Sequence, residues 1–320
     1  MSARSRRGAA GAASGAPAPP TVSVVVPTRD RPEMLRRAVA SILGQDYAGE
    51  IECVVVFDRT EIALPDVEVP AGRTLRAVPN ERTPGLAGAR NSGIVASTGS
   101  LVAHCDDDDE WLPEKIRLEV DALAARPDAS MVGTGMFVHY DGKVFPRVPD
   151  LPEITFRTLL RSRIADVHTS SFLIRKEDLD GRIGLVDEEL PRSHAEDYEF
   201  MLRAARHGPI VVVRRPLVRA YWHPVSFFAE SWSTHAAALE ELLRRFPEFR
   251  TDRVGYARIS GQIAFLLAGA GERRRSMEWV RRAVGADWRE RRAYIALLVS
   301  SRLVSPGFVL RMAHRAGKGI

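Results

Sequence analysis

The hydrophobic residues of the chain fall into short runs that alternate with amphipathic segments. Four apolar runs, rich in β-branched residues and bounded by turn residues, are typical of buried strands: residues 21–28, 51–57, 74–78 and 101–105. Between these runs, apolar residues recur at helical spacing in three segments, residues 31–45, 85–97 and 111–127. Strands that alternate with helices in this way predict a mainly parallel sheet covered by helices.

The pattern changes after residue 130. A stretch of short strands and turns extends to Pro191 and includes a predicted hairpin around Asp141 and Gly142. A compact helix is expected over residues 196–208, and a further strand over residues 209–222.

Beyond about residue 227 the sequence becomes helical and rich in arginine. We therefore predict an α/β fold with a C-terminal helical appendage. Its three parts are a disordered tail over residues 1–20, a core over residues 21–230, and a basic helical region over residues 231–320.

The first twenty residues consist mostly of Ala, Gly, Ser, Pro and Arg, and they lack the apolar block of a signal peptide. A transit sequence is an alternative to a disordered tail, but the segment has no amphipathic stripe. Cys53 and Cys105 lie inside apolar runs and are not spaced as metal ligands or as a redox motif. We therefore expect both to be core residues of a protein in a reducing compartment, the cytoplasm.

The formal net charge of +5 is unevenly distributed. Residues 241–320 contain 17 Lys and Arg against 7 Asp and Glu, so the positive charge belongs to the C-terminal region. Its basic residues alternate with Leu, Val and Trp on helices, without the aromatic platforms of single-strand binders, so no nucleic-acid partner is predicted. Cations that flank apolar turns in residues 288–312 predict either peripheral contact with an anionic membrane or packing on the core or in a dimer. No window approaches eighteen uninterrupted apolar residues, so no membrane span is expected.

Four consecutive aspartates, residues 106–109, directly follow the strand at residues 101–105. The carboxyl edge of a parallel sheet is where ligands bind, and adjacent carboxylates repel one another unless a cation offsets them. Their hard oxygens suit Mg²⁺ or Mn²⁺, with phosphate oxygens completing the shell. The alternative is a solvated acidic turn that caps a helix starting near Trp111, a role that would be sufficient for Asp109.

Four segments match a known family in both order and spacing: VSVVVPTRDRPEMLRRAVASILGQ from residue 22, GLAGARNSGI from residue 85, DDDDEWLPEKI from residue 106, and EDYEFMLRAARHG from residue 196. Through these segments, which extend over about residues 21–225, the chain resembles family 2 glycosyltransferases of the GT-A fold. The resemblance implies an inverting enzyme that uses a nucleotide-diphosphate sugar, with a UDP-sugar favoured. The donor's nucleotide pocket and the metal site are then expected at the carboxyl edge of the first four strands.

The resemblance assigns the base and ribose pocket to Pro27 and Arg29, on the loop of the first strand, and to Asp58 after the second strand. Arg29 stands where an aromatic residue is common in the family, and its guanidinium plane could stack on the base instead. Phe57 replaces the first acid of the family's usual pair. The alternatives are a surface arginine at position 29 and a turn-capping aspartate at position 58.

The resemblance also assigns Arg90 to the diphosphate or uracil, where a cation would stabilise the leaving group. An ordinary arginine on the helix surface is the alternative. Asp106 and Asp107 are expected toward the ribose, and Asp108 is expected to bind Mn²⁺ or Mg²⁺ directly. His223, after the last core strand, matches a position near the metal and diphosphate, although a packed histidine beside Trp222 would look the same.

An inverting transfer needs a general base that deprotonates the acceptor hydroxyl. The resemblance assigns this role to Asp197, while Glu196 points about 100° away on the same helix. The alternative is that both acids only stabilise the helix N-terminus. His168 is a weaker candidate that borders the acceptor site.

The chain lacks the Gln-x-x-Arg-Trp signature of processive synthases, which predicts transfer of one sugar to a glycan, lipid-linked or small-molecule acceptor. The expected location is cytoplasmic, with peripheral contact at the inner face of the membrane as a further hypothesis. No glycine-rich phosphate loop follows the first strand, which argues against a nucleotidyltransferase. A catalytically degenerate binding or membrane-recruitment module is the remaining alternative.

Overall fold

The computed structural model describes residues 18–222 and 232–315. Its strands, in chain order, are β1 Val22–Thr28, β2 Ile51–Phe57, β3 Arg73–Pro79, β4 Leu101–His104, β5 Glu110–Trp111, β6 Met131–Tyr140, β7 Lys143–Arg147, β8 Glu153–Ile154, β9 Leu173–Arg175 and β10 Ile210–Tyr221. Its helices are α1 Pro32–Leu43, α2 Leu86–Ala96, α3 Lys115–Ala124, α4 Phe156–Arg161, α5 Lys176–Asp180, α6 Glu196–Ala205, α7 Trp232–Arg245, α8 Arg253–Gly269, α9 Arg273–Ala286, α10 Arg291–Ser300 and α11 Pro306–Arg315.

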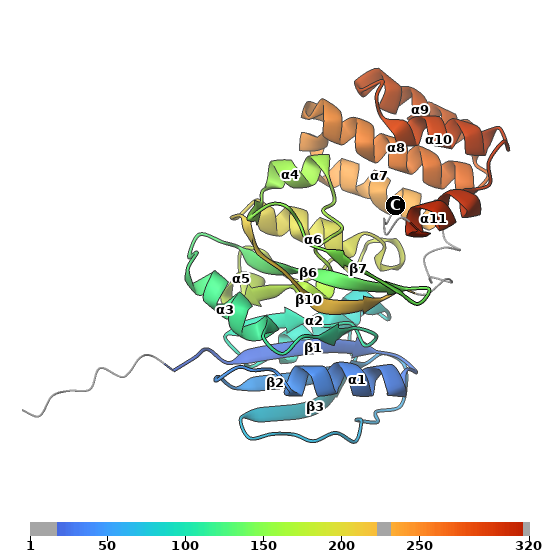
Figure 1. Ribbon diagram of the computed structural model, residues 1–320. Helices are drawn as coiled ribbons and strands as arrows, with labels where there is room; N and C mark the ends of the chain where they lie inside the picture. Colours follow the sequence, from blue (N-terminus) through green and yellow to red (C-terminus); the bar gives the residue numbers. More distant parts are fainter. Residues whose placement is uncertain (1–17, 223–231, 316–320) are drawn as a thin grey trace, which may run out of the picture.

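One mixed sheet runs through the molecule in the order β3-β2-β1-β4-β9-β6-β10-β5 (Figure 1). The first four strands in this order are parallel, as the alternation of strands and helices predicted. β9 is antiparallel to both of its neighbours, β4 and β6, and β10 then pairs in parallel with β6. The predicted α/β fold with a mainly parallel sheet is therefore confirmed.

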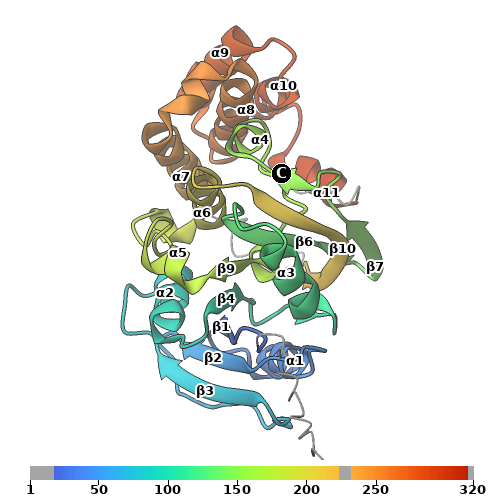
Figure 2. The ribbon, with the colours of Figure 1, turned by 90° about the vertical axis from the view of Figure 1, so that its left-hand side faces the viewer.

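The two faces of the sheet are covered by different helices. Along β1, Val22, Val24 and Val26 belong to a core with α1 and α3, whereas Val25 belongs to a core with α2 and α6. Figure 2 shows α1 and α3 on one side of the sheet and α2 and α6 on the other. A strand buried on both faces is apolar at nearly every position, which explains why β1 is apolar except at Ser23 and Thr28.

Gly93 allows α2 to lie close to the sheet. A Cβ at this position would lie 2.3 Å from a Cγ of Val25 and 2.9 Å from a Cγ of Val56. Any side chain at position 93 would therefore push the helix away from β1 and β2.

The predicted hairpin around Asp141 is confirmed and is formed by β6 and β7. Elsewhere, tertiary pairing overrode the local sequence pattern. The helix expected from Trp111 begins only at Lys115, because Glu110 and Trp111 pair with β10 as the short strand β5. Two short helices, α4 and α5, lie in the stretch that was expected to hold only strands and turns. Each is short enough that neighbouring elements, and not its own periodicity, determine its structure.

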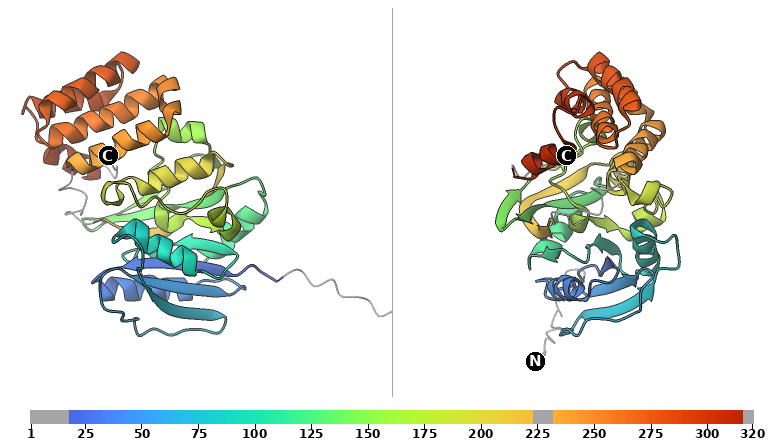
Figure 3. Two further views of the ribbon diagram at one scale, coloured as in Figure 1. Left: turned by 180° about the vertical axis from the view of Figure 1, so that it is seen from behind. Right: turned by 90° about the vertical axis from the view of Figure 1, so that its right-hand side faces the viewer.

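The helices after residue 232 gather at one end of the molecule, beyond α6, as Figures 1 and 3 show. α8 is almost entirely buried and packs against α7, α9 and α10. Apolar residues of these helices share one core with α2, α4 and α6. Buried Arg258 of α8 also donates a hydrogen bond to the hydroxyl of Tyr198 on α6 at 2.5 Å. The boundary near residue 230 stays a prediction, since this core continues across it.

None of the described helices combines the length and the apolar content that crossing a membrane requires. Cys53 and Cys105 are buried in the core, as expected from their apolar surroundings. Of the predicted disordered tail, residues 1–17 lie outside the described residues, and so does His223.

Candidate active site

The four aspartates form a loop at the carboxyl end of β4, which lies beside β1 in the centre of the sheet. The end of β1 holds this loop: the Thr28 hydroxyl donates to Asp107 at 2.8 Å. Arg31, just beyond β1, donates from one nitrogen to Asp107 at 3.1 Å and to Asp108 at 3.0 Å. The acidic loop, residues 106–109, is therefore fixed at the edge of the sheet where the sequence predicted a ligand.

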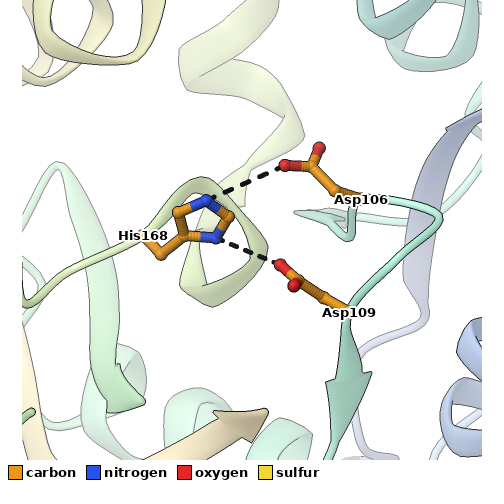
Figure 4. A group of neighbouring side chains, drawn as sticks. All are labelled: Asp106, Asp109 and His168. Carbon is orange, nitrogen blue, oxygen red and sulfur yellow. Dashed lines mark ion pairs between the residues drawn. The ribbon is translucent and has the colours of Figure 1, made fainter. Parts of the chain in front are cut away.

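His168 lies between two of these aspartates (Figure 4). Its Nδ1 is 3.2 Å from Asp109 Oδ2, and its Nε2 is 3.9 Å from Asp106 Oδ2. Ser170 joins the same two acids, because its hydroxyl donates to Asp109 at 2.6 Å and accepts from the backbone N–H of Asp106 at 3.0 Å. One ligand atom from each of Asp106, Asp109 and His168 lies within 4.8 Å of the others, a spacing that could hold a metal ion.

The electrostatics of the loop show an excess of negative charge. Burial and three neighbouring carboxylates raise the pKa of Asp108 to about 7, although Arg31 opposes this shift. Burial lowers the pKa of His168, but Asp109 and Asp106 outweigh it and raise the pKa to about 9. Both shifts have the direction expected where carboxylates are crowded and incompletely neutralised.

Arg90 of α2 connects the acidic loop to α6. Its side chain is only 2% exposed, and it donates to Asp106 at 2.7 Å and to Glu196 at 2.5 Å. The alternative of a surface arginine is therefore wrong. Contact between Arg90 and a diphosphate stays a prediction, because both of its terminal nitrogens already have carboxylate partners in this structure.

Asp197 lies in the first turn of α6, two residues after Ala195, whose φ of 60° is in the left-handed region. Its carboxylate is ion-paired with Arg163 and accepts a hydrogen bond from the backbone N–H of Tyr198. Although burial raises its pKa, Arg163 outweighs this effect and lowers it, so Asp197 is ionised. Strained backbone before an ionised acid is typical of functional sites.

Glu196, the neighbour of Asp197, has a different environment. Burial raises its pKa to about 7, even though Arg90 acts in the opposite direction. The Glu196 side chain is 7% exposed against 16% for Asp197. Of the two acids, Asp197 is therefore more accessible, and Glu196 is engaged by Arg90.

The residues predicted for the base and ribose pocket lie at the adjacent strand ends. Asp58, at the end of β2, is buried and accepts from the Asn80 amide at 2.8 Å. Arg29 is half exposed after β1, with Asp30 3.6 Å away. The placement of Pro27 on the loop was wrong, because β1 extends through Thr28 and buries Pro27 opposite Val56. A role for these residues in binding a donor stays a prediction.

A buried group that the sequence interpretation missed supports the acidic loop from α3. Trp111 follows the loop and donates its indole N–H to the Ser170 carbonyl at 2.8 Å. The Lys115 ammonium lies 3.8 Å from the centre of the Trp111 ring and 2.7 Å from Glu119. Lys115 and Glu119 are both fully buried. Because they are four residues apart on a helix, the sequence alone indicated only an ordinary ion pair on the helix surface.

The predicted site residues are thus partly brought together. Asp106, Asp107 and Asp108 share one loop, and His168, only a weak candidate, lies within that cluster. The helix-capping interpretation of Asp109 is wrong, since α3 begins at Lys115 and Asp109 instead contacts His168 and Ser170.

A family profile, several relatives and several solved structures match this chain. Residues 23–182, half of the chain, match the profile of "Glycosyl transferase family 2". AmsB of Erwinia amylovora, an amylovoran biosynthesis glycosyltransferase, is 28% identical over 222 residues, which are 64% of this chain and 70% of AmsB.

WfgD of Escherichia coli, a UDP-Glc:α-D-GlcNAc-diphosphoundecaprenol β-1,3-glucosyltransferase, is 24% identical over 141 residues, 44% of this chain. The chain spans 55% of the length of WfgD and as little as 14% of another curated relative.

Among solved structures, S. aureus TarS 1–349 in complex with UDP-GlcNAc is similar with a TM-score of 0.54 at 18% identity, over 93% of this chain and 92% of that one. This likeness shows the fold, and it confirms the GT-A architecture implied by the resemblance. The chain therefore belongs to glycosyl transferase family 2.

Proposed function

We propose that the protein transfers one sugar from a nucleotide-diphosphate sugar to an acceptor hydroxyl, with inversion at the anomeric carbon and with assistance from a divalent metal. The observation that carries this proposal is the link made by Arg90, which ties Asp106 of the acidic loop to Glu196, next to Asp197. The proposed donor-binding edge and the proposed general base would thereby be held as one unit. The UDP-GlcNAc bound to TarS and the UDP-Glc in the name of WfgD favour a UDP-sugar as donor.

The donor half of the proposed site is the edge formed by β1, β2 and β4. We assign the base and ribose to Pro27, Arg29 and Asp58, of which Arg29 offers a half-exposed guanidinium plane. Asp106 and Asp107 would accept from ribose hydroxyls, since carboxylate oxygens are strong acceptors.

Arg90 would stabilise the negative charge that develops on the leaving nucleoside diphosphate. Its two carboxylate partners hold the guanidinium between the acidic loop and α6. Arg31, already 3.0 Å from Asp108, is a second cation at the same edge.

The residues present fit a divalent metal. Oxygen ligands from a crowded acidic loop suit Mn²⁺ or Mg²⁺, and a cation would relieve the repulsion that raises the pKa of Asp108 to about 7. We propose Asp108 as the direct ligand because 25% of its side chain is exposed, whereas only 4% of Asp109 is. Asp106 and His168 form a group with Asp109 whose spacing could hold an ion at the same loop, and the sequence also suggests His223. The ion's chemistry would be the neutralisation of diphosphate charge.

Asp197 is proposed as the general base. The acceptor oxygen attacks the anomeric carbon as its proton passes to the Asp197 carboxylate, and the bond between that carbon and the diphosphate oxygen breaks in line. The nucleoside diphosphate leaves with the bonding electrons. Arg163, paired with Asp197, keeps the base ionised before the acceptor arrives.

The acceptor is proposed to be a glycan, a lipid-linked saccharide or a small molecule, and the C-terminal helices are proposed to contact a membrane peripherally. Supporting this contact, Leu303 is 75% exposed, while Phe308 and Met312 on or near α11 are about half exposed. Flotation with anionic liposomes tests the contact. Protein that remains at the bottom of the gradient would rule it out.

The transfer itself is tested by incubating the full chain with UDP-, GDP-, dTDP- and CDP-sugars, an acceptor panel and Mn²⁺. We expect release of one nucleoside diphosphate per sugar transferred, and nuclear magnetic resonance of the product should show the inverted anomeric configuration. A retained configuration would disprove the single-displacement mechanism, even if transfer occurs.

A further inference from the structure

A cavity separate from the acidic loop lies among the C-terminal helices. It has a volume of ≈600 Å³ and is lined by Arg244, Arg250, Arg275, Arg282, Tyr256 and Trp279, together with two glutamates. We call it the arginine-lined cavity. Its volume is in the range of small-molecule sites, roughly 300–1,000 Å³.

The four arginines differ in how far other residues neutralise them. Arg275 pairs with Glu240 at 2.9 Å and Glu272 at 2.6 Å, and Arg244 pairs with Glu241 on its own helix. Within the described chain, by contrast, neither Arg250 nor Arg282 forms an ion pair with a carboxylate. Two guanidinium groups therefore face the cavity with their hydrogen-bonding capacity largely available.

These two arginines come from different elements. Arg250 belongs to the short 3-10 turn Pro247–Thr251 before α8, and Arg282 belongs to α9. The Arg282 guanidinium lies 4.3 Å from the centre of the Trp279 ring, which gives it a fixed platform. Trp279 is in turn held by a 2.9 Å hydrogen bond from its indole N–H to Glu240. One of the two free cations is thus positioned by packing.

The surrounding surface is also positive. The sequence of α9 contains five arginines and one glutamate, Glu278, which itself lines the cavity. Glu240, the other lining acid, is already neutralised by Arg275. A concave surface with this charge attracts anions, and a guanidinium fork matches the oxygens of a phosphate better than it matches a single point charge.

We propose that the arginine-lined cavity binds a phosphate or diphosphate group, with Arg250 and Arg282 as its main ligands. The group could belong to a soluble phosphorylated compound or to a phospholipid headgroup, which present the same oxygens. This inference does not depend on the proposed donor site.

The first test is isothermal titration of the full-length protein with pyrophosphate in metal-free buffer. We expect saturable binding, and the double variant Arg250→Gln/Arg282→Gln should bind at least about tenfold more weakly, because it loses two charge-assisted contacts. The matched control is Arg274→Gln/Arg281→Gln, which removes two exposed arginines of α9 that do not line the cavity. This control should bind within about twofold of the wild type.

Equal binding by the wild type and the Arg250→Gln/Arg282→Gln variant would overturn the proposal, as would an equal loss in both double variants. All four substituted side chains are exposed, so the melting temperatures should match and a failure to fold should not obscure the result.

The source of the phosphate is distinguished by a second ligand, glycerophosphoglycerol, the deacylated headgroup of phosphatidylglycerol. Binding of this compound that requires Arg250 and Arg282 would favour a lipid headgroup, whereas binding of pyrophosphate alone would favour a soluble compound. Binding of neither would overturn the proposal.

An Asp108→Asn variant, which leaves the buried pair of Arg90 and Asp106 intact, separates this site from the catalytic one. It should lose Mn²⁺-dependent binding of UDP while keeping the binding of pyrophosphate without metal. Loss of pyrophosphate binding in this variant would place the anion near the acidic loop and overturn the cavity as its site.

Discussion

The acidic loop and the arginine-lined cavity both concentrate charge, but they do so in opposite ways. In the first region Arg90 is 2% exposed and bound by two carboxylates, so its charge is part of the protein's interior. In the second, Arg250 and Arg282 are exposed and form no ion pair with a carboxylate among the described residues. Buried charges that are mutually paired fix geometry, and exposed ones remain available to a ligand.

This difference predicts two kinds of mutant. Removing a charge at the acidic loop leaves a buried partner without compensation, so both folding and activity should suffer. Removing an exposed arginine at the cavity costs little stability, because water replaces its contacts.

The largest expected effect is that of Asp197→Asn. An amide cannot take the acceptor proton, so we expect kcat to fall by about a thousandfold, the usual contribution of a general base. Initial rates under saturating donor measure this effect. The control Asp180→Asn changes an exposed acid, 57% accessible, and should leave kcat unchanged. Residual activity above about a tenth of the wild type in Asp197→Asn would show that another group is the base.

Arg90→Met should lower the free energy of unfolding by about 3–5 kcal/mol, since it strands Asp106 and Glu196 in a buried setting. Urea denaturation measures the change. Arg126→Met removes exposed ion pairs with Asp128 and Glu153 and should cost at most about 1 kcal/mol. If both variants lose the same free energy, Arg90 is not the link that we describe.

His235 of α7 should make stability depend on pH. Burial and the neighbouring charge of Arg163 lower its pKa to about 3, with Asp197 opposing this and His194 adding to it. In the unfolded chain the pKa is near 6.5, so below that pH the unfolded state binds the extra proton, and stability is lost as pH falls toward 3.

Between pH 7.5 and pH 5 the wild type should lose about 2 kcal/mol more than His235→Phe, which keeps an aromatic ring against His194. Urea midpoints at the two pH values measure this difference. His207→Gln, at an exposed position, should behave like the wild type. If His235→Phe loses as much stability between the two pH values as the wild type, His235 is not the cause.

The smallest expected effect is at the cavity. Glu278→Gln removes an exposed acid that has no arginine partner among the described residues, so pyrophosphate should bind about threefold more tightly. Isothermal titration measures it. Unchanged or weaker binding would indicate that the anion does not approach Glu278.

The sequence was most informative where one strand determines its own structure. The apolar runs of β1 and β2 and the acidic loop after β4 were predicted, because period and composition alone specify a buried parallel strand. The family resemblance predicted the roles of residues 106–108 and of Asp197. No local pattern required β5, whose two residues pair only with β10.

The contacts that organise the site could not be predicted. Arg90 and Glu196, which form an ion pair, are 106 residues apart in the sequence. His168 and Asp109 also come from distant parts of the chain. Such pairs depend on the order of strands in the sheet, which hydrophobic periodicity does not determine. Trp111 and Lys115 were likewise assigned to one helix, and only pairing with β10 separated them.

The central claim, that the acidic loop binds a metal and a nucleoside diphosphate, is tested most directly by thermal unfolding with UDP in the presence and absence of Mn²⁺. Ligand at about 100 times its Kd should stabilise the wild type by roughly 2.7 kcal/mol. We predict that this Mn²⁺-dependent shift is absent in Asp108→Asn and retained in Glu50→Gln, an exposed acid away from the loop. An equal shift in Asp108→Asn, or no Mn²⁺-dependent shift with UDP, GDP, dTDP or CDP, would contradict the account.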